Sequence, residues 1–194
     1  MISRRNLVIG LCAGGASWAI SPLVDCPLAE ATSAQALSLR ELLLRSRHAV
    51  FATPTGVEAR WESYAGTRRI VTYTKVAVDQ AADGRATAQS ELLVRTLGGK
   101  VGHIGQLVHG EARLVLGRPA LLFVNPDLEQ IWRVTGMAQG HYPLESDKSG
   151  VQRLLKSPDL PQLKALENAA VRVLPGRTVL EAERLLASEL GAAR

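Results

Sequence analysis

The spacing of apolar residues changes twice along the chain. From His48 to Tyr142 apolar and polar residues tend to alternate, and on either side of this region apolar residues recur every three or four positions. The first spacing is typical of strands with one buried face, and the second is typical of helices packed on a core. The pattern therefore predicts a β region flanked by helical segments.

The clearest strand is Val57-Glu58-Ala59-Arg60-Trp61-Glu62, which alternates without interruption between apolar and charged residues. The segment from Arg69 to Asp79 is dense in β-branched residues and is the predicted partner strand. The loop from Ser63 to Thr67, which contains Gly66, is of hairpin length. Trp61 lies on the apolar side of its strand, so we expect it in the core.

Further strands are predicted at short spacing, separated by turn-forming glycines and prolines. They are Glu91 to Thr96, Ala112 to Leu116, Ala120 to Val124 and Gln130 to Thr135. A sheet of about six antiparallel strands in a chain of this size needs its edges hidden, which favours closure or folding over. The predicted fold class is mainly β, α+β overall, built as a small antiparallel β-barrel or sandwich.

Short helices are predicted at both ends of the β region. The segment from Leu37 to Ser46 begins with Ser38 and Glu41 at the spacing of a capping box, and Thr178 and Glu181 form a second one. Toward the C-terminus helical spacing recurs in Val151-Leu154-Leu155, Leu163-Leu166-Ala170 and Val179-Ala182-Leu186-Leu190. We expect a helical extension packed on the β domain, since its apolar faces would otherwise be exposed. A loosely attached arm that meets a partner is the alternative.

The start of the chain resembles a twin-arginine export signal. Arg4 and Arg5 precede an uncharged stretch from Leu7 to Ile20, and Ala34-Gln35-Ala36 offers the small residues that a signal peptidase prefers. The uncharged stretch is shorter than the roughly twenty apolar residues that span a bilayer, which favours removal over a retained N-terminal anchor. We therefore predict cleavage after Ala36.

The predicted organisation has three segments. Residues 1–36 form the export signal peptide, residues 37–146 the β-barrel or sandwich domain, and residues 147–194 the helical C-terminal extension. The predicted location is periplasmic or secreted, reached through the twin-arginine route.

Removal of the leader would change the chemistry available to the chain. Both cysteines, Cys12 and Cys26, precede the predicted cut, so the mature chain would lack thiols for disulfides, metal clusters, haem attachment or nucleophilic catalysis. The net charge of +5 would not change, because the leader carries two arginines and two carboxylates. Scattered arginines predict a basic surface that attracts anionic polymers. Nucleic acid is not an expected partner, since aromatics are sparse and the basic residues are not clustered.

The densest cluster of unusual residues is the glycine-rich run from Leu97 to Glu111. It has neither the spacing of a nucleotide-binding P-loop nor that of a dinucleotide fingerprint, and we expect no cofactor. Its glycines permit positive φ in a tight, exposed connection. Its backbone N–H groups, with basic side chains nearby, are suited to an anionic or carbonyl-rich group. The candidate binding residues are Arg95, Gly98, Gly99, Lys100, Gly102, His103, Gly105 and Gln106.

The same run contains a weaker candidate metal site. His103, His109 and Glu111 are suitable zinc ligands, and His141 is a candidate fourth ligand. Their spacing matches no metal-binding signature, so a metal-dependent hydrolase centred on these residues is an alternative function. Carboxylate pairs for sugar hydrolysis carry no local spacing. The candidates for such a pair are Glu58, Glu62, Asp79 and Glu111.

Five stretches of the chain carry a resemblance to a known family. They are Arg68-Arg69-Ile70-Val71-Thr72-Tyr73-Thr74, Leu97-Gly98-Gly99-x-Val101-Gly102-x-Ile104-Gly105-Gln106, Gly110-Glu111-Ala112, Leu121-Leu122-Phe123-Val124 and Gly136-Met137-Ala138-Gln139-Gly140. Between about Leu37 and Tyr142 the chain resembles an uncharacterised family of exported bacterial β-domain proteins. The resemblance implies a recurring extracytoplasmic β module, with no assigned activity, cofactor or catalytic residue. The turn Ala82-Asp83-Gly84-Arg85 departs from the Lys-Gly usual in that family.

These observations predict an exported, non-enzymatic binding or structural protein of the cell envelope or extracellular space. It would recognise an envelope or extracellular protein or an anionic polymer through the glycine-rich loop and a basic surface, and would have no stable transmembrane anchor. An accessory or assembly factor that acts through the C-terminal helices is a further alternative.

Overall fold

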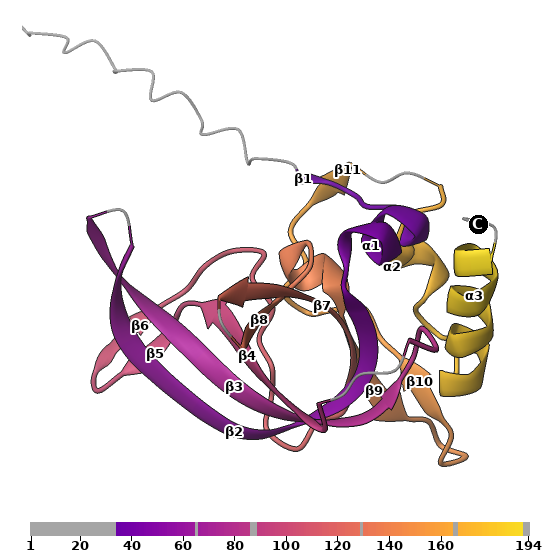
Figure 1. The fold of residues 1–194 in the computed structure, drawn as a ribbon, viewed down its shortest axis with the longest axis horizontal. Coiled ribbons are helices and arrows are strands. Elements are labelled where there is room, and N and C mark those ends of the chain that lie inside the picture. Colours follow the sequence, from indigo (N-terminus) through magenta and orange to yellow (C-terminus); the bar gives the residue numbers. More distant parts are fainter. Residues whose placement is uncertain (1–33, 65, 86–88, 129, 165–166, 192–194) are drawn as a thin grey trace, which may run out of the picture. The chain divides into compact units, whose positions relative to one another are not determined.

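One large sheet dominates the fold (Figure 1). The structure, a computed structural model, describes residues 34–64, 66–85, 89–128, 130–164 and 167–191. The strands of the large sheet are β2 (His48–Tyr64), β3 (Thr67–Ala81), β4 (Glu91–Leu97), β7 (Ala120–Leu128), β8 (Ile131–Val134), β9 (His141–Ser146) and β10 (Gln152–Leu154). They lie in the order β10-β9-β7-β2-β3-β4-β8.

This sheet closes on itself. β8 pairs with β7 as well as with β4, so that β7, β2, β3, β4 and β8 form a ring. The β4–β8 contact is parallel and consists of two residue pairs, Leu93 with Ile131 and Val94 with Trp132. The other pairings of the sheet are antiparallel. The mainly β prediction is confirmed. The one parallel contact was not predicted, and it arises because strands of alternating direction cannot close an odd-numbered ring without one such contact.

Apolar side chains from every strand of the ring fill a first core. It includes Val50, Ala52, Val76, Leu92, Val94, Leu122, Val124, Trp132 and Val134. The neighbouring residues along β2 and β7, such as Phe51, Leu121 and Phe123, belong to a second core together with Tyr142. Successive residues of a strand face opposite sides. The continuous apolar run at the start of β7 is therefore explained by burial on both faces.

The second core lies between the ring and the helices, which gather on one side of it (Figure 1). The helices are α1 (Leu39–Arg45), η1 (Met137–Gly140, a 3₁₀ helix), α2 (Ala170–Val173) and α3 (Val179–Gly191). The capping box that begins α1 is confirmed, since the Glu41 N–H donates to Ser38 Oγ at 3.2 Å and the Ser38 N–H donates to Glu41 Oε2 at 2.9 Å. α1 buries Leu39, Leu42 and Leu43 in this core.

The C-terminal extension ends in the predicted helix. The Thr178 N–H donates to Glu181 Oε2 at 2.8 Å, and the Glu181 N–H donates to Thr178 Oγ1 at 3.3 Å, which confirms the second capping box. α3 buries Ala182 and Leu186 in the second core, so its apolar face is used within the fold. Among the described residues, no helix combines the length and the apolar character needed to cross a bilayer.

The part of the extension that precedes α3 was predicted to be helical, and most of its described residues are not. Gln152–Leu154 is strand β10, paired with the edge of β9, and Leu163–Lys164 is strand β11. Of the described residues in the region expected to carry two helices, only the four residues of α2 are helical. The free edge of β9 offers backbone partners to residues 152–154, and Pro158 and Pro161 lack the N–H groups that a continuous helix requires.

Two further predictions about the β region are corrected. The segment from Ala112 to Leu116 belongs to no strand, and Leu116 lies in a turn. Its hydrogen bonds go to other partners, such as the Asp159 carboxylate, which accepts from the Arg113 N–H at 3.2 Å. Trp61 is 36% exposed and lies outside both cores, because β2 extends beyond its pairing with β7, which ends at Ala52. The Arg68 guanidinium covers the Trp61 ring at 5.0 Å.

The residues at the predicted cleavage point belong to the fold. β1 (Ala34–Gln35) pairs in parallel with β11, and the buried Ala36 donates its N–H to the Lys164 carbonyl at 3.2 Å. The Leu37 N–H donates to Gln139 Oε1 at 2.8 Å. A cut after Ala36 would remove β1 and the Ala36 hydrogen bond and would turn the Leu37 N–H into a charged amino group. The predicted leader up to Ser33, including Arg4 and Arg5, lies outside the described residues.

These contacts predict that the start point of the chain affects stability. A chain that begins at Leu37 lacks β1 and Ala36 and places a charged amino group beside Gln139. We expect its free energy of unfolding to be about 1–3 kcal/mol below that of a chain that begins at Ala34, by urea denaturation at neutral pH. Equal stabilities would contradict the assignment of residues 34–36 to the fold.

His141 is a buried histidine at the start of β9, and its imidazole favours the neutral form. Its ring lies 3.2 Å from Ser157 Oγ through Nδ1 and is 4% exposed. Burial lowers the pKa of His141 to about 4, which the Asp159 carboxylate only partly opposes. The unfolded chain therefore takes up a proton below its ordinary pKa of about 6.5, whereas the folded chain stays neutral until about 4.

Folding stability is consequently expected to fall as the pH decreases from about 6.5 to about 4, with a slope of up to about 1.4 kcal/mol per pH unit from this group. His141→Asn removes the titrating group and should flatten this part of the stability–pH curve, measured by denaturation across the range. The exposed His103→Asn is the control and should retain the wild-type slope. The prediction fails if H141N and wild type lose stability in parallel.

Candidate functional site

A cavity of about 730 Å³ opens next to the point where the pairing of β4 with β8 ends. Beyond the two residue pairs that join β4 to β8, Arg95 to Leu97 of β4 and Arg133 and Val134 of β8 line the cavity. Asn125 and Asp127 of β7 contribute to the same lining. The gap between the two strands therefore becomes a recess in the protein surface.

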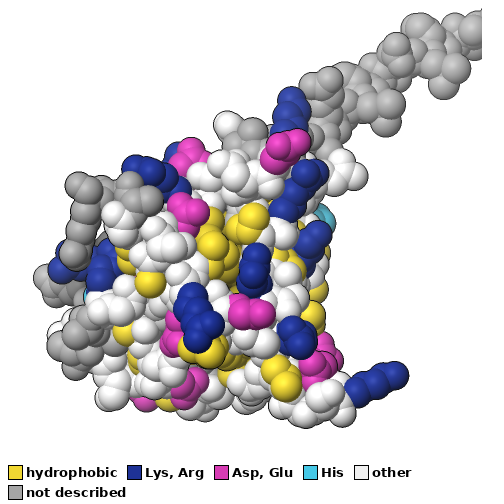
Figure 2. All heavy atoms as spheres, turned by 90° about the vertical axis from the view of Figure 1, so that its right-hand side faces the viewer, with side chains coloured by type: hydrophobic (Ala, Val, Ile, Leu, Met, Phe, Trp, Pro, Cys, Tyr) yellow, Lys and Arg dark blue, Asp and Glu magenta, His cyan; other side chains and the backbone are white. Residues whose placement is uncertain are grey.

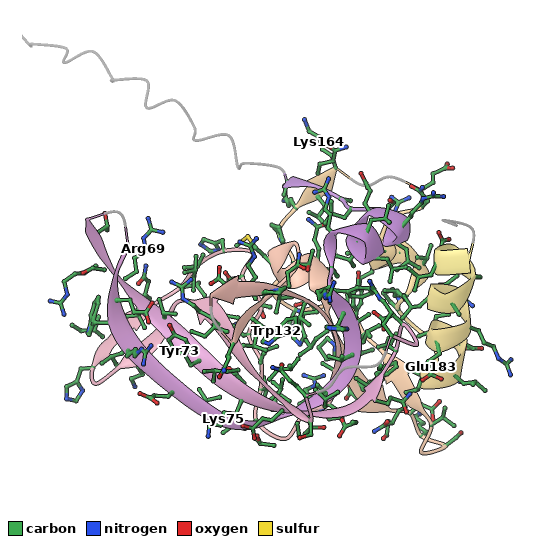
Figure 3. The ribbon with its side chains drawn as sticks, viewed as in Figure 1. Arg69, Tyr73, Lys75, Trp132, Lys164 and Glu183 are labelled. Atoms are coloured by element: carbon green, nitrogen blue, oxygen red, sulfur yellow. The ribbon has the colours of Figure 1, made fainter. Side chains whose placement is uncertain are left out.

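Arginines from four separate elements meet at this recess. Arg45 comes from the end of α1, Arg69 from β3, Arg95 from β4 and Arg133 from β8. The acidic residues of the lining are Glu111 and Asp127. Figure 3 shows Arg69 projecting near the free end of the β2–β3 hairpin, while Trp132 lies among the strands of the ring. We call this recess the arginine pocket.

Arg95 is held in place by two carboxylates. Its Nη2 lies 3.2 Å from Glu62 Oε2 and its Nη1 lies 3.1 Å from Asp127 Oδ2. Glu62 also accepts a hydrogen bond of 2.5 Å from the Tyr73 hydroxyl. Burial opposes the ionisation of Glu62, but the hydrogen bonds from Tyr73, Arg60 and Arg95 outweigh it and keep the pKa of Glu62 below its usual value. This network fixes the guanidinium of Arg95 at the pocket wall.

Arg45 and Arg133 are more loosely held. The nearest carboxylate oxygen lies 3.9 Å away in both cases, on Glu41 for Arg45 and on Asp127 for Arg133. Their side chains are 61% and 62% exposed, compared with 15% for Arg95. Long, exposed ion pairs contribute little stability. Both guanidinium groups can therefore turn toward an incoming anion at little cost to the fold.

Glu111 is the buried acid of the pocket. It is 9% exposed, and its Oε1 accepts a hydrogen bond of 3.3 Å from the Ala112 N–H. Burial raises the pKa of Glu111, and the backbone hydrogen bonds from Leu97 and Ala112 and the charge of Arg95 oppose this only in part. The carboxyl group therefore carries its negative charge less readily than an exposed glutamate does.

A second cavity, of about 390 Å³, lies against the first. Thr96, Leu97 and Glu111 line both cavities. The second cavity lies between the β2–β3 hairpin and the segment that follows β4, and Val57, Ala59, Leu107, Val108 and Leu114 contribute apolar surface to its lining. We call it the apolar cavity.

The glycine-rich run forms a structural hairpin. Its strands are β5 (Gly99–Val101) and β6 (Ile104–Gln106), joined by a turn in which Gly102 has φ 59°. The Gly98 N–H donates to the Ile70 carbonyl at 2.8 Å, and the Ile70 N–H donates to Gln106 Oε1 at 2.6 Å. The Gly98 N–H, one of the backbone groups expected to recognise an anion, is therefore engaged in the fold.

The predicted binding residues are dispersed by this hairpin. Arg95 lines the arginine pocket, whereas Gly98, Gly99, Lys100 and Gln106 line the apolar cavity. Gly102 and His103 lie in the exposed turn, and Gly105 lies in β6. The structure thus brings one of the predicted residues into the arginine pocket.

The candidate metal ligands do not form a metal site. His103 and His109 are exposed, while Glu111 is buried. His141 is buried and lies beside Ser157. In the part of the chain that the structure describes, no group of three or more His, Cys, Asp and Glu side chains could hold a metal ion.

The sequence interpretation did not identify Arg45, Arg69 and Arg133. They are separated along the chain and carry no local motif, and they meet only because the ring brings α1, β3 and β8 to one gap. On the face that carries α3 the basic residues are dispersed, since Lys and Arg side chains lie there among acidic and apolar ones (Figure 2). The local convergence, not the net charge, distinguishes the pocket.

Comparison with known proteins yields no relative. No protein-family model, no curated protein and no solved structure matches this chain. The resemblance to exported bacterial β-domain proteins therefore stays a prediction. The function has to be argued from the geometry of the pocket.

The hairpin assignment predicts a strong effect at Gly99. This residue has φ 127°, and a Cβ built on it would collide with the Thr72 hydroxyl. Gly99→Ala should lower the free energy of unfolding by about 2–4 kcal/mol, since backbone strain and the clash add. Gly102→Ala is the matched control, because its φ of 59° is also positive but a Cβ there meets no atom within 4 Å. A loss for G99A no larger than for G102A, by urea denaturation, would refute the structural role.

Proposed function

We propose that this protein is a non-enzymatic binding protein whose arginine pocket holds an anionic group of its ligand. The convergence of Arg45, Arg69, Arg95 and Arg133 on one recess carries the proposal. Guanidinium groups bind carboxylates and phosphates in a planar, two-point geometry, which makes arginine the preferred side chain for such anions. The volume of the recess is that of a small-molecule site.

The weak pairing of two of these arginines supports an anion. Arg95 is closely paired with Glu62 and Asp127, whereas Arg45 and Arg133 have carboxylate oxygens only at 3.9 Å. Glu111, the buried carboxyl of the lining, has a raised pKa. A bound carboxylate or phosphate would give Arg45 and Arg133 a closer partner.

The other functions considered receive less support. A metal-dependent hydrolase centred on His103, His109 and Glu111 requires side chains that converge, and two of these are exposed while the third is buried. An accessory factor acting through the C-terminal helices would need an apolar face free for a partner, and α3 packs its buried residues into the second core.

The proposed setting is outside the cytoplasm. The twin-arginine-like start of the chain supports export to the periplasm or beyond. The cell envelope is rich in polymers and lipids that carry phosphate or carboxylate groups, which are the groups that guanidinium side chains bind.

Calorimetric titration with citrate and with inorganic phosphate tests the proposal. We expect saturable binding that weakens as salt is raised, because ionic screening reduces the attraction of exposed charges. The double variant Arg45→Gln and Arg133→Gln should bind at least about tenfold more weakly, since two charge-assisted contacts are lost. The fold should be retained, because neither side chain makes a close ion pair.

Arg184→Gln is the control for a change of surface charge outside the pocket. It removes one positive charge from the exposed surface of α3, away from the residues that line the pocket. Its affinity should equal that of the wild type. If R184Q and the double variant weaken binding equally, net charge and not the pocket governs binding, and the proposal is wrong. Absence of any binding of either anion would also refute it.

A further inference from the structure

The apolar cavity leaves hydrophobic surface uncovered beside the arginine pocket. Leu107 is 65% exposed and Val57 is 47% exposed, and both contribute to its lining. Ala59, Val108 and Leu114 add further apolar surface. Exposed apolar surface gathered in a recess is typical of a binding site, whereas single exposed apolar residues are common on any protein.

The two cavities are adjacent and share one wall. Thr96, Leu97 and Glu111 line both, so a molecule that fills the arginine pocket reaches the boundary of the apolar cavity. The short β4–β8 contact accounts for this adjacency, since pairing stops at Val94 and Thr96 and Leu97, which follow on β4, line both cavities. Glu111 stands at this boundary and resists ionisation because it is buried.

The polar groups of the apolar cavity are largely used within the protein. The Thr72 hydroxyl donates to the Gly98 carbonyl at 2.7 Å, and Gln106 Oε1 accepts from the Ile70 N–H. Arg113 forms an ion pair of 2.5 Å with Asp159. Lys100 is exposed. The surface left for a ligand is therefore mainly apolar in the apolar cavity. It is cationic in the arginine pocket, on the other side of the wall formed by Thr96, Leu97 and Glu111.

We propose that the ligand is a single-chain amphiphile, with an anionic head group in the arginine pocket and an apolar chain in the apolar cavity. Charge complementarity at one end and uncovered apolar surface at the other end determine this class. A fatty-acid anion and a singly acylated phosphate share this chemistry. The inference rests on the proposed anion binding and adds the apolar part of the ligand.

Affinity for a series of carboxylates tests the inference. Acetate, octanoate and dodecanoate present the same head group with increasing apolar length, and each is titrated below its micellar concentration. Burial of each added methylene should raise the affinity severalfold until the cavity is filled. We expect octanoate to bind at least about tenfold more tightly than acetate, and dodecanoyl phosphate to follow dodecanoate.

Variants separate the head-group site from the chain site. The double variant Leu107→Gln and Val57→Thr should reduce the ratio of octanoate affinity to acetate affinity by about tenfold. Its affinity for citrate should be unchanged. Leu180→Gln on α3 is the control, because Leu180 is also exposed, at 54%, but lies outside the apolar cavity. It should behave as the wild type does.

The outcomes distinguish the inference from the proposed function. Citrate binding with equal affinities for acetate and dodecanoate would overturn the amphiphile and leave anion binding intact. The affinity could rise with the length of the carboxylate and yet be no weaker in the Arg45→Gln and Arg133→Gln double variant. That result would overturn the proposed function. Binding to vesicles of anionic phospholipid, with no binding of monomeric dodecanoate, would overturn the inference in favour of a membrane surface.

Discussion

The two residue pairs that join β4 to β8 are the constraint on which the rest of the structure depends. A ring of five strands must contain one parallel contact, and here that contact ends after Leu93–Ile131 and Val94–Trp132. Before this point the ring encloses an apolar core. After it the strands no longer pair, and the residues that follow on both strands line a recess. The fold and the candidate site thus have one structural origin.

The charges around this recess divide into a fixed and an adaptable part. Glu62 and Asp127 hold Arg95, so this arginine keeps a defined position without a ligand. Arg45 and Arg133 lie at the exposed side with carboxylates 3.9 Å away. The preorganised Arg95 reduces the entropic cost of binding, whereas ordering of the two exposed arginines adds to it. The adjoining apolar cavity extends the same site toward a ligand with a hydrophobic part.

Local patterns in the sequence predicted much of the fold. The strand predicted from Val57 to Glu62 and the two capping boxes depend on neighbouring residues, and the structure confirms each, although Val57 and Trp61 on the apolar side of this strand are exposed. Sequence patterns were less informative about segments whose structure depends on partners that are distant along the chain. Residues 152–154 have helical spacing but pair with the edge of β9, and residues 112–116 look like a strand but find no partner strand. The arginine pocket depends most on distant partners, because its arginines are brought together only by closure of the ring. The glycine-rich run, which the sequence suggested as the binding loop, forms the β5–β6 hairpin.

The central claim is that anions bind at the gap between β4 and β8. It is tested most directly by a nuclear magnetic resonance titration of the isotopically labelled protein with citrate, following arginine side-chain and backbone N–H signals. The account predicts saturable shifts for the Arg45, Arg95 and Arg133 side chains and for the backbone of residues 133–137. Shifts confined to the β5–β6 hairpin, or spread evenly over the basic surface, would contradict it.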